Sequence, residues 1–95
     1  MKQISVNQLD QKWPILDVRE LGEFSQGHLA GARNLPLSEF ESWAAQLDPK
    51  ETYQILCQSG SRSQMASMVL ARAGFSVVNV SDGMMAYKGA TVNEL

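Results

Sequence analysis

Residues 53–74 read YQILCQSGSRSQMASMVLARAG and contain the only cysteine of the chain, Cys57. The segment begins with a short apolar run, continues through small polar residues, and becomes a long apolar-rich stretch that ends at Gly74. This order predicts a strand over 54–56, a tight loop, and a helix over 62–73 with Gly74 just beyond its end. The thiol is therefore expected between the end of a strand and the positive end of a helix.

The residue types in this loop suit a reactive thiolate. A loop of this kind turns backbone N–H groups inward, and Gly60 permits backbone angles that a Cβ would obstruct. Such donors, together with the helix N-terminus and Arg62, favour the charged form of the thiol. The alternative is that Cys57 is simply a small buried apolar residue. We expect Cys57 to be catalytic, with a substrate-binding cradle made of Gln58, Ser59, Gly60, Ser61, Arg62 and Ser63.

Arg62 has two possible roles in this cradle. It can stabilise the thiolate and brace the loop, or its forked guanidinium can contact the oxygens of an anionic donor. The sequence leaves both roles open.

Composition sets the broad class. The chain has 95 residues, is 44% hydrophobic and carries a formal net charge of −2, which fits one globular domain over residues 1–95. Its scattered basic residues argue against nucleic-acid binding. A lone cysteine suits a reducing compartment, and neither a signal peptide nor a membrane span of about 20 apolar residues is visible. We therefore expect a cytoplasmic protein without a membrane partner.

Strand and helix patterns alternate along the chain. Asn7 and Ser38 are the expected N-caps of two helical segments. Strands are expected over 4–6, 14–19, 33–35, 54–56 and 76–80. Helices or helical turns are expected over 7–9, 20–26, 38–47, 62–73 and 84–88. The helix over 38–47 has a predicted buried face formed by Leu37, Phe40, Trp43, Ala44 and Leu47. This alternation predicts an α/β fold with a mainly parallel sheet, whose ligands bind beyond the carboxyl ends of the strands.

Four further residues are expected to support the site. Asp17 and Arg19, with Glu23 nearby, form a charged cluster at a strand end that we expect to brace the loops through ion pairs. His28, the only histidine, has no second ligand partner, so we expect a structural hydrogen bond and no metal site. Asp82 is expected to be a turn residue near the pocket.

Three blocks in this order resemble the rhodanese-like domain family. LDVRELGEFSQGHLAGARNLP at 16–36 resembles its first signature block, CQSGSRS at 57–63 its active-site loop, and VVNVSDGMMAYKG at 77–89 its closing block. The resemblance implies a three-layer α/β fold with a roughly five-stranded parallel sheet flanked by helices. It also implies a thiosulfate sulfurtransferase-type enzyme without a cofactor. In such an enzyme Cys57 takes sulfur from a small sulfur-containing anion or a protein persulfide, becomes a persulfide, and passes the sulfur to a thiol or to cyanide.

The closing block departs from the family pattern at two positions. Met84 stands where a second glycine is usual, and Tyr87 stands where a tryptophan is usual. We expect Tyr87 to pack with a hydrogen-bond partner for its hydroxyl, and Met84 to alter the pocket rim. Neither is expected to touch the Cys57 loop directly.

Two other functions remain as alternatives. Cysteine-dependent phosphatases and arsenate reductases have five residues between cysteine and arginine, whereas only four separate Cys57 from Arg62, which predicts a tighter ring suited to one sulfur atom. The second alternative is a rhodanese-like module that binds a partner without catalysis or relays sulfur from a cysteine desulfurase.

Overall fold

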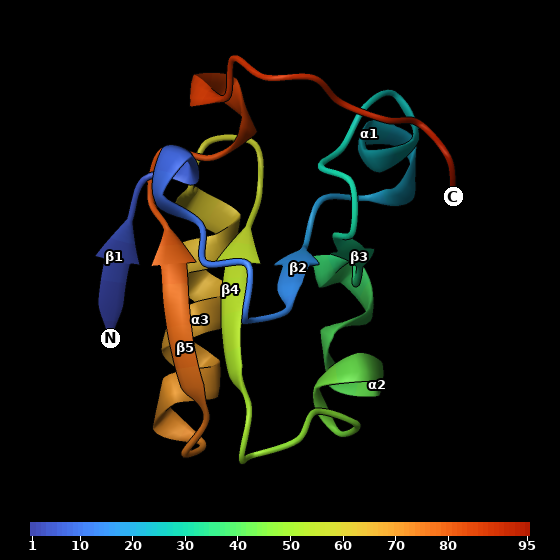
Figure 1. The fold of residues 1–95 in the computed structure, drawn as a ribbon. Helices are drawn as coiled ribbons and strands as arrows, with labels where there is room; N and C mark the ends of the chain where they lie inside the picture. Colours follow the sequence, from blue (N-terminus) through green and yellow to red (C-terminus); the bar gives the residue numbers. More distant parts are fainter.

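A five-stranded parallel sheet organises the chain, and the computed structural model describes all residues, 1–95. Figure 1 shows the strands in the order β1-β5-β4-β2-β3, and every pairing between neighbours is parallel. The strands are β1 (Lys2–Ile4), β2 (Ile15–Asp17), β3 (Arg33–Asn34), β4 (Thr52–Leu56) and β5 (Ser76–Val80). The predicted α/β class with a parallel sheet is therefore confirmed.

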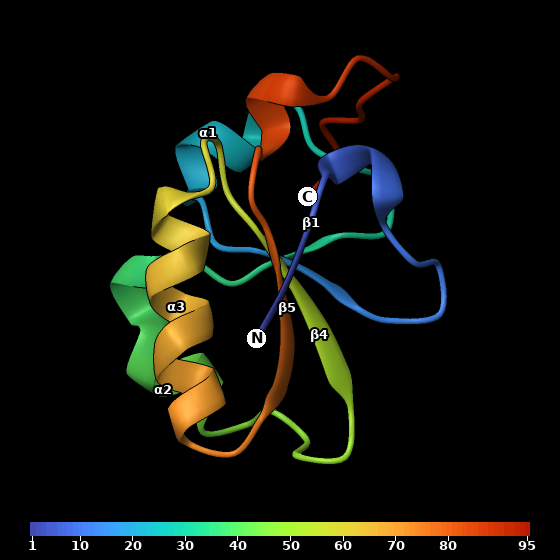
Figure 2. The same ribbon diagram turned by 90° about the vertical axis from the view of Figure 1, so that its left-hand side faces the viewer.

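The helices cover the two faces of this sheet unequally. The α-helices are α1 (Leu21–Ser25), α2 (Phe40–Ala44) and α3 (Ser61–Arg72), and the 3-10 helices are η1 (Val6–Gln8), η2 (Leu37–Glu39) and η3 (Met84–Ala86). Figure 2 shows α2 and α3 against one face, while η1 and the chain that follows it lie across the other. The long helix and the sheet centre thus form the main packing unit.

The core forms on both sides of the central strand β4. The larger cluster lies under α2 and α3, where Trp43, Ile55 and Leu70 pack together with Cys57. The smaller cluster on the other side includes Leu56. Adjacent residues of β4 thus face opposite clusters, so both faces of this strand are buried, including at the polar residue Gln54.

Helix α3 ends as its sequence predicted. Gly74 has a φ of 97°, its N–H donates to the carbonyl of Ala71, and the N–H of Phe75 donates to the carbonyl of Leu70. This paired arrangement satisfies the last carbonyls of the helix, and glycine adopts the left-handed conformation without a steric cost.

The N-terminal segment differs from its prediction. The strand covers Lys2–Ile4 and not 4–6, and the N-cap of η1 is Ser5, whose hydroxyl accepts from the N–H of Asn7. The cause is the Asp82 carboxylate, which accepts 2.7 Å hydrogen bonds from the Ser5 hydroxyl and the Val6 N–H. These bonds turn the chain out of the sheet after Ile4.

The helix predicted over 38–47 is also shorter than expected. Helix α2 covers only Phe40–Ala44 and is preceded by η2, and Ser38 caps neither element. The Ser38 hydroxyl instead donates to Glu20, with an O–O distance of 2.6 Å. The predicted buried face is still correct, because its five apolar residues are buried in or packed against the larger cluster.

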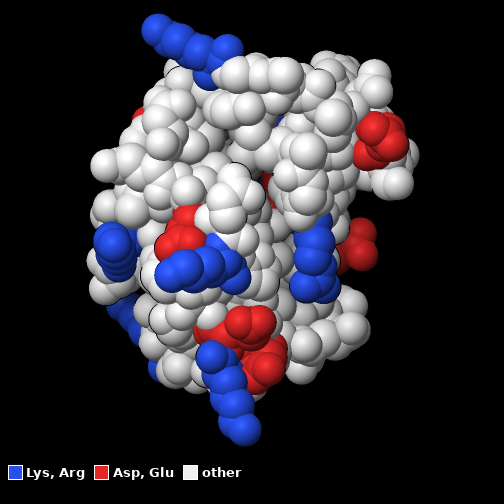
Figure 3. Space-filling model, in the orientation of Figure 1, with Lys and Arg blue, Asp and Glu red and all other residues white.

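Charged side chains of both signs are interspersed on the face shown in Figure 3, where no continuous basic surface is visible. The longest helix, α3, has 12 residues, and no helix combines the length and apolar composition of a membrane span.

Candidate active site around Cys57

Cys57 follows β4 directly and lies at the carboxyl edge of the sheet. The residue is 0% exposed, so a reaction partner has to bring its reacting atom into the loop. Asp17 ends β2 and Asp82 lies two residues after β5, so the structure places both at the same edge. Figure 1 shows this edge covered by the loop after β4, by η3 and by α1.

Two backbone N–H donors and one hydroxyl surround the Cys57 sulfur. The N–H groups of Gly60 and Ser63 point at Sγ with N–S distances of 3.1 and 3.3 Å. The Ser63 Oγ accepts from the thiol at 3.4 Å and donates to the carbonyl of Gly60 at 3.1 Å. In the thiolate form the same hydroxyl can turn to donate to the sulfur. The hydroxyls of Ser59 and Ser61 bond to each other instead. Ser63 is therefore the only serine of the loop whose side chain reaches the sulfur.

These hydrogen bonds shift the pKa of the Cys57 thiol. Burial raises the pKa of Cys57, but hydrogen bonds from the Ser63 hydroxyl and from the N–H groups of Ser63, Gly60 and Ser59 outweigh it. The pKa of Cys57 is consequently held below its ordinary value. Because the thiolate is the nucleophile, the loop prepares the sulfur for attack.

Two glycines allow the loop to take this shape. Gly60 is the N-cap of α3 with a φ of 94°, and a Cβ there would overlap the carbonyl oxygen of Ser81. Gly83 has a φ of 67°, and its Cβ would overlap the carbonyl group of Gln58. The Cys57 loop and the turn after β5 therefore interlock at backbone distance, which only glycine permits at either position.

The closing block also bonds directly to the loop. The N–H groups of Met84 and Met85 donate to the carbonyls of Cys57 and Gln58 at 2.9 and 3.0 Å. The expectation that Met84 does not touch the loop is therefore wrong, because its backbone does. The carbonyls of Cys57 and Gln58 therefore point out of the loop toward η3, while the N–H groups of Gly60 and Ser63 point into the loop toward the sulfur.

The side chains at the two unusual positions both pack inward. Met84 and Tyr87 lie against the smaller core cluster, and the Tyr87 hydroxyl donates to the carbonyl of Ala90 at 2.9 Å. The expected packing and hydrogen bond of Tyr87 are confirmed.

Arg62 is held by a carboxylate that the sequence did not assign to it. Its two terminal nitrogens donate to the two carboxylate oxygens of Glu23 at 2.6 and 2.8 Å. The hydrogen bonds with Arg62 lower the pKa of Glu23 to about 2, and the same contact raises the pKa of Arg62. Glu23 was expected to join Asp17 and Arg19. Glu23 lies in α1, which follows the end of β2, so it is at the same edge of the sheet as the Cys57 loop. Its position after a predicted strand is the sequence signal that could have indicated the contact with Arg62.

Asp17 and Arg19 form a second, buried ion pair. The Arg19 guanidinium contacts the Asp17 carboxylate at 2.9 Å and also donates to the carbonyl of Gly27 at 2.9 Å. Its remaining terminal nitrogen lies 3.4 Å from the side-chain oxygen of Gln58. The Asn34 side chain, which sequence reasoning missed, donates to the carbonyls of Asp17 and Arg19. This network links the β2 end to the first residue of the cradle.

The side chains of His28 and Asp82 form hydrogen bonds with segments near the Cys57 loop and not with the loop itself. The His28 ring stacks on Phe24, and its Nδ1 lies 2.7 Å from the Phe24 carbonyl oxygen. The backbone of His28 pairs with Val92 near the C-terminus. Burial raises the pKa of Asp82, but its hydrogen bonds with Ser5 and Val6 outweigh this and lower it. Neither side chain has a hydrogen bond to the Cys57 loop.

Comparisons with known proteins place this geometry in a family. The model of the rhodanese-like domain matches residues 2–90. The putative sulfur carrier protein YrkF of Bacillus subtilis is 40% identical over 83 residues, which cover 86% of this chain but only 45% of that protein. Thiosulfate sulfurtransferase GlpE of Shewanella oneidensis is 34% identical over 87 residues, which cover 86% of each chain.

Solved structures agree with the sequence matches. The crystal structure of a rhodanese-like domain protein from Staphylococcus aureus aligns over 100% of both chains with a TM-score of 0.89 and 25% identity. The fold, the loop around Cys57 and the family match over nearly the whole length lead to one conclusion. This chain belongs to the rhodanese-like domain family.

Proposed function

We propose that this chain is a sulfurtransferase in which Cys57 carries the transferred sulfur as a persulfide. The observation that carries the proposal is the convergence of the Gly60 and Ser63 N–H groups on Sγ, with the Ser63 Oγ 3.4 Å from the same sulfur. These donors stabilise a thiolate before transfer and an anionic persulfide after it. Relatives named sulfur carrier and sulfurtransferase support the same class of reaction.

The reaction proceeds in two balanced displacements. The Cys57 thiolate attacks the outer sulfur of thiosulfate, a bond forms between the two sulfurs, and the sulfur–sulfur bond of the donor breaks to release sulfite. A thiolate or cyanide then attacks the outer sulfur of the Cys57 persulfide and leaves with it, which regenerates the thiolate. The sulfur moves without net oxidation, so no metal or cofactor enters either step.

Sulfur is favoured over phosphate by what surrounds the loop. Phosphoryl groups are bound by free guanidinium and amide donors around several oxygens. Here Arg62 is engaged by Glu23 through both of its terminal nitrogens, and the inward amides contact a single sulfur atom. The cytoplasm fits the proposal, because a reducing compartment keeps a lone thiol free.

The test is intact-protein mass spectrometry after incubation with thiosulfate. We expect Cys57 to gain the mass of one sulfur atom, and cyanide to remove it with formation of thiocyanate. Full thiosulfate:cyanide activity in Cys57→Ser would disprove the mechanism. Hydrolysis of an aryl phosphate without sulfur transfer would instead favour a phosphatase, and binding of a partner without either reaction would favour a non-catalytic module.

A further inference from the structure

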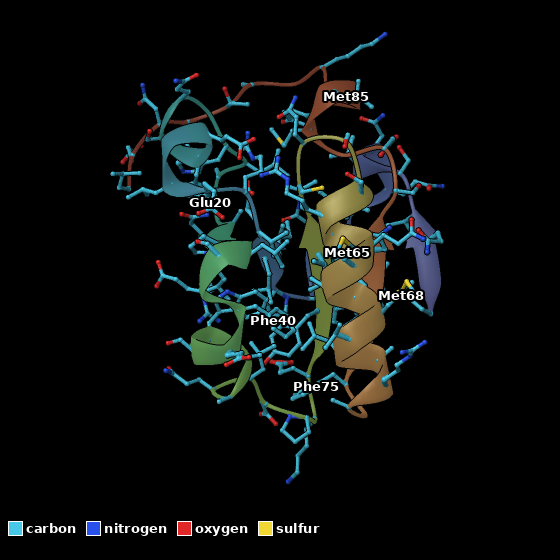
Figure 4. The ribbon with its side chains drawn as sticks, turned by 180° about the vertical axis from the view of Figure 1, so that it is seen from behind. Glu20, Phe40, Met65, Met68, Phe75 and Met85 are labelled. Carbon is cyan, nitrogen blue, oxygen red and sulfur yellow. The ribbon has the colours of Figure 1, made fainter.

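An apolar groove lies between α2 and α3, next to the Cys57 loop. It has a volume of about 220 Å³ and is lined by Leu37, Phe40, Met65, Ala66 and Val69. Figure 4 shows Phe40 between the two helices and Met65 on α3, and both side chains line the groove.

The groove is unusually apolar for a surface feature. Met65 is 64% exposed and Val69 is 54% exposed, although both are large apolar side chains. No other part of the chain covers them, because the C-terminal segment runs instead to α1, where Val92 pairs with His28 (Figure 1). Contiguous exposed apolar residues of this kind mark surfaces that contact a partner.

The groove is close to the reacting sulfur. Ser63, which contacts Sγ, and Ala66, which lines the groove, lie one turn apart on α3. With a rise of 1.5 Å per residue, the groove extends from roughly 3 to 9 Å along the helix axis beyond Ser63. A segment seated in the groove can therefore place a cysteine three residues away at the mouth of the loop, since three extended residues span about 10 Å.

Exposed acidic residues are close to the α2 side of the groove in the chain. Glu39 and Glu41 flank Phe40 in the chain, and Figure 4 shows Glu20 above α2 at the end nearer the Cys57 loop. All three side chains are exposed and none forms a salt bridge, whereas the exposed basic residue of α3 is Arg72. A basic partner complements these carboxylates, while a second copy of the chain would bring like charges together.

The charges at the sulfur site point to a donor that is itself a protein. Both arginines of the site are already paired, Arg19 with Asp17 and Arg62 with Glu23. The site thus offers no unpaired cation to attract a small dianion such as thiosulfate. A persulfide carried by a protein needs no such cation, because contacts elsewhere on that protein supply its binding energy.

We propose that this groove docks a basic segment of a persulfide-carrying donor protein, whose apolar side chain packs between Phe40 and Met65. This inference rests on the sulfurtransferase function proposed above. The Cys57 thiolate attacks the outer sulfur of the docked persulfide, the donor sulfur–sulfur bond breaks, and the donor leaves as a thiolate. Cys57 holds the persulfide afterwards, and no external oxidant or reductant takes part.

The test uses two synthetic peptides that each carry one cysteine persulfide and a leucine three residues away. In one peptide the flanking residues are lysines and in the other they are glutamates. The rate at which Cys57 gains one sulfur is measured by mass spectrometry for each peptide, and with thiosulfate as a small donor. The variants are Val69→Asp in the groove, the charge variant Glu39→Gln with Glu41→Gln, and the control Met68→Asp.

Met68 is a matched control because it is an exposed methionine of the same helix that does not line the groove. We expect the lysine peptide to react about tenfold faster than the glutamate peptide, which corresponds to about 1.4 kcal/mol. The ratio of the lysine-peptide rate to the thiosulfate rate should fall by about the same factor in Val69→Asp. It should fall by several-fold in the double glutamine variant and stay at the wild-type value in Met68→Asp.

The possible failures can be told apart. Equal rates from the two peptides, or an unchanged ratio in Val69→Asp, would overturn the docking proposal while sulfur gain from thiosulfate still supports the function. No sulfur gain from any donor would overturn the function itself. A wild-type dimer in analytical ultracentrifugation that Val69→Asp dissociates would assign the groove to self-association instead.

Discussion

Glu23 and Arg62 form a two-point ion pair across the mouth of the Cys57 loop, with N–O distances of 2.6 and 2.8 Å. The residues are 39 positions apart in the chain, and the pair joins α1 to the first turn of α3. Each side chain keeps about a third of its surface exposed. The pair therefore connects the loop to the rest of the sheet edge while remaining open to solvent, ions and substrate.

The first prediction concerns pH and stability. Pairing lowers the pKa of Glu23 from its ordinary value of 4.5 to about 2. A carboxylate with a lowered folded-state pKa stabilises the fold above its unfolded-state pKa, and that contribution is lost as the pH falls toward 2. Solvent screening limits the pair to about 0.5–1 kcal/mol. In urea unfolding, Glu23→Gln should lower the free energy of unfolding by this amount at pH 7 and by almost nothing at pH 2.

A double-mutant cycle with Arg62→Gln supplies the control. The coupling energy between the two positions should be favourable at pH 7 and disappear at pH 2. A coupling energy near zero at both pH values would show that the ion pair does not stabilise the fold.

The second prediction separates the two roles of Arg62. In Glu23→Gln the guanidinium is free, so thiosulfate should bind several-fold more tightly, seen as a lower KM with little change in kcat. Arg62→Ala should lower thiosulfate turnover in the wild type and also in the Glu23→Gln background. If Arg62→Ala has no effect in that background, Arg62 braces the loop and does not contact the anion.

The third prediction concerns the hydroxyl of Ser63. It lies 3.4 Å from the sulfur and is one of the groups that lower the pKa of Cys57. Removing it in Ser63→Ala should raise the pKa and slow alkylation by iodoacetamide at pH 7 by about three- to tenfold. The pH at which alkylation reaches half of its maximum should move upward. Ser59→Ala is the matched control, because its hydroxyl bonds to Ser61 and its backbone N–H is retained.

Much of the fold could be predicted because its signals are local. The end of α3 at Gly74 and Phe75 depends on hydrogen bonds within five residues, and three of the five residues of β5 are β-branched valines. The predicted bounds and caps were wrong where a carboxylate from a distant part of the chain accepts a hydrogen bond from a group that was expected to bond locally. Asp82 reaches Ser5 from 77 positions away, and Glu20 takes the Ser38 hydroxyl that was expected to cap a helix. Single-sequence patterns carry no information about such partners.

The same division applies to the site. The thiol, the amide cradle and the need for Gly60 follow from a stretch of seven residues, so the sequence predicted them. The Glu23–Arg62 pair and the close approach of Gly83 to Gln58 depend on which strand ends meet at one edge. That arrangement follows from the strand order, which the sequence did not specify.

The fourth prediction concerns a buried hydroxyl that has no hydrogen-bond partner. Ser67 lies on the buried side of α3 at 0% exposure, and its Oγ is unpaired. Ser67→Ala removes an unsatisfied polar group and improves helix propensity, so it should stabilise the protein by about 1 kcal/mol in urea unfolding. The difference between Gln64→Ser and Gln64→Ala, at an exposed position of the same helix, measures the Ser-to-Ala propensity effect alone. A loss of stability in Ser67→Ala would contradict the absence of a partner.

The fifth prediction compares two glycines with nearly the same backbone angle. Gly60 and Gly74 have φ values of 94° and 97°, but a Cβ at Gly74 has nothing within 4 Å, whereas one at Gly60 overlaps the Ser81 carbonyl. Gly74→Ala should therefore cost only the conformational strain, about 1 kcal/mol. Gly60→Ala adds a backbone collision and should cost several kcal/mol more by urea unfolding.

The two variants should also differ in function. Relief of the collision at Gly60 has to move either the turn after β5 or the loop itself, which turns the Gly60 N–H away from the sulfur. Sulfur gain at Cys57 should therefore be lost in Gly60→Ala and kept in Gly74→Ala, as measured by mass spectrometry with thiosulfate. Similar small losses of stability and normal sulfur gain in both variants would show that the loop does not depend on the close approach of Gly60 to Ser81.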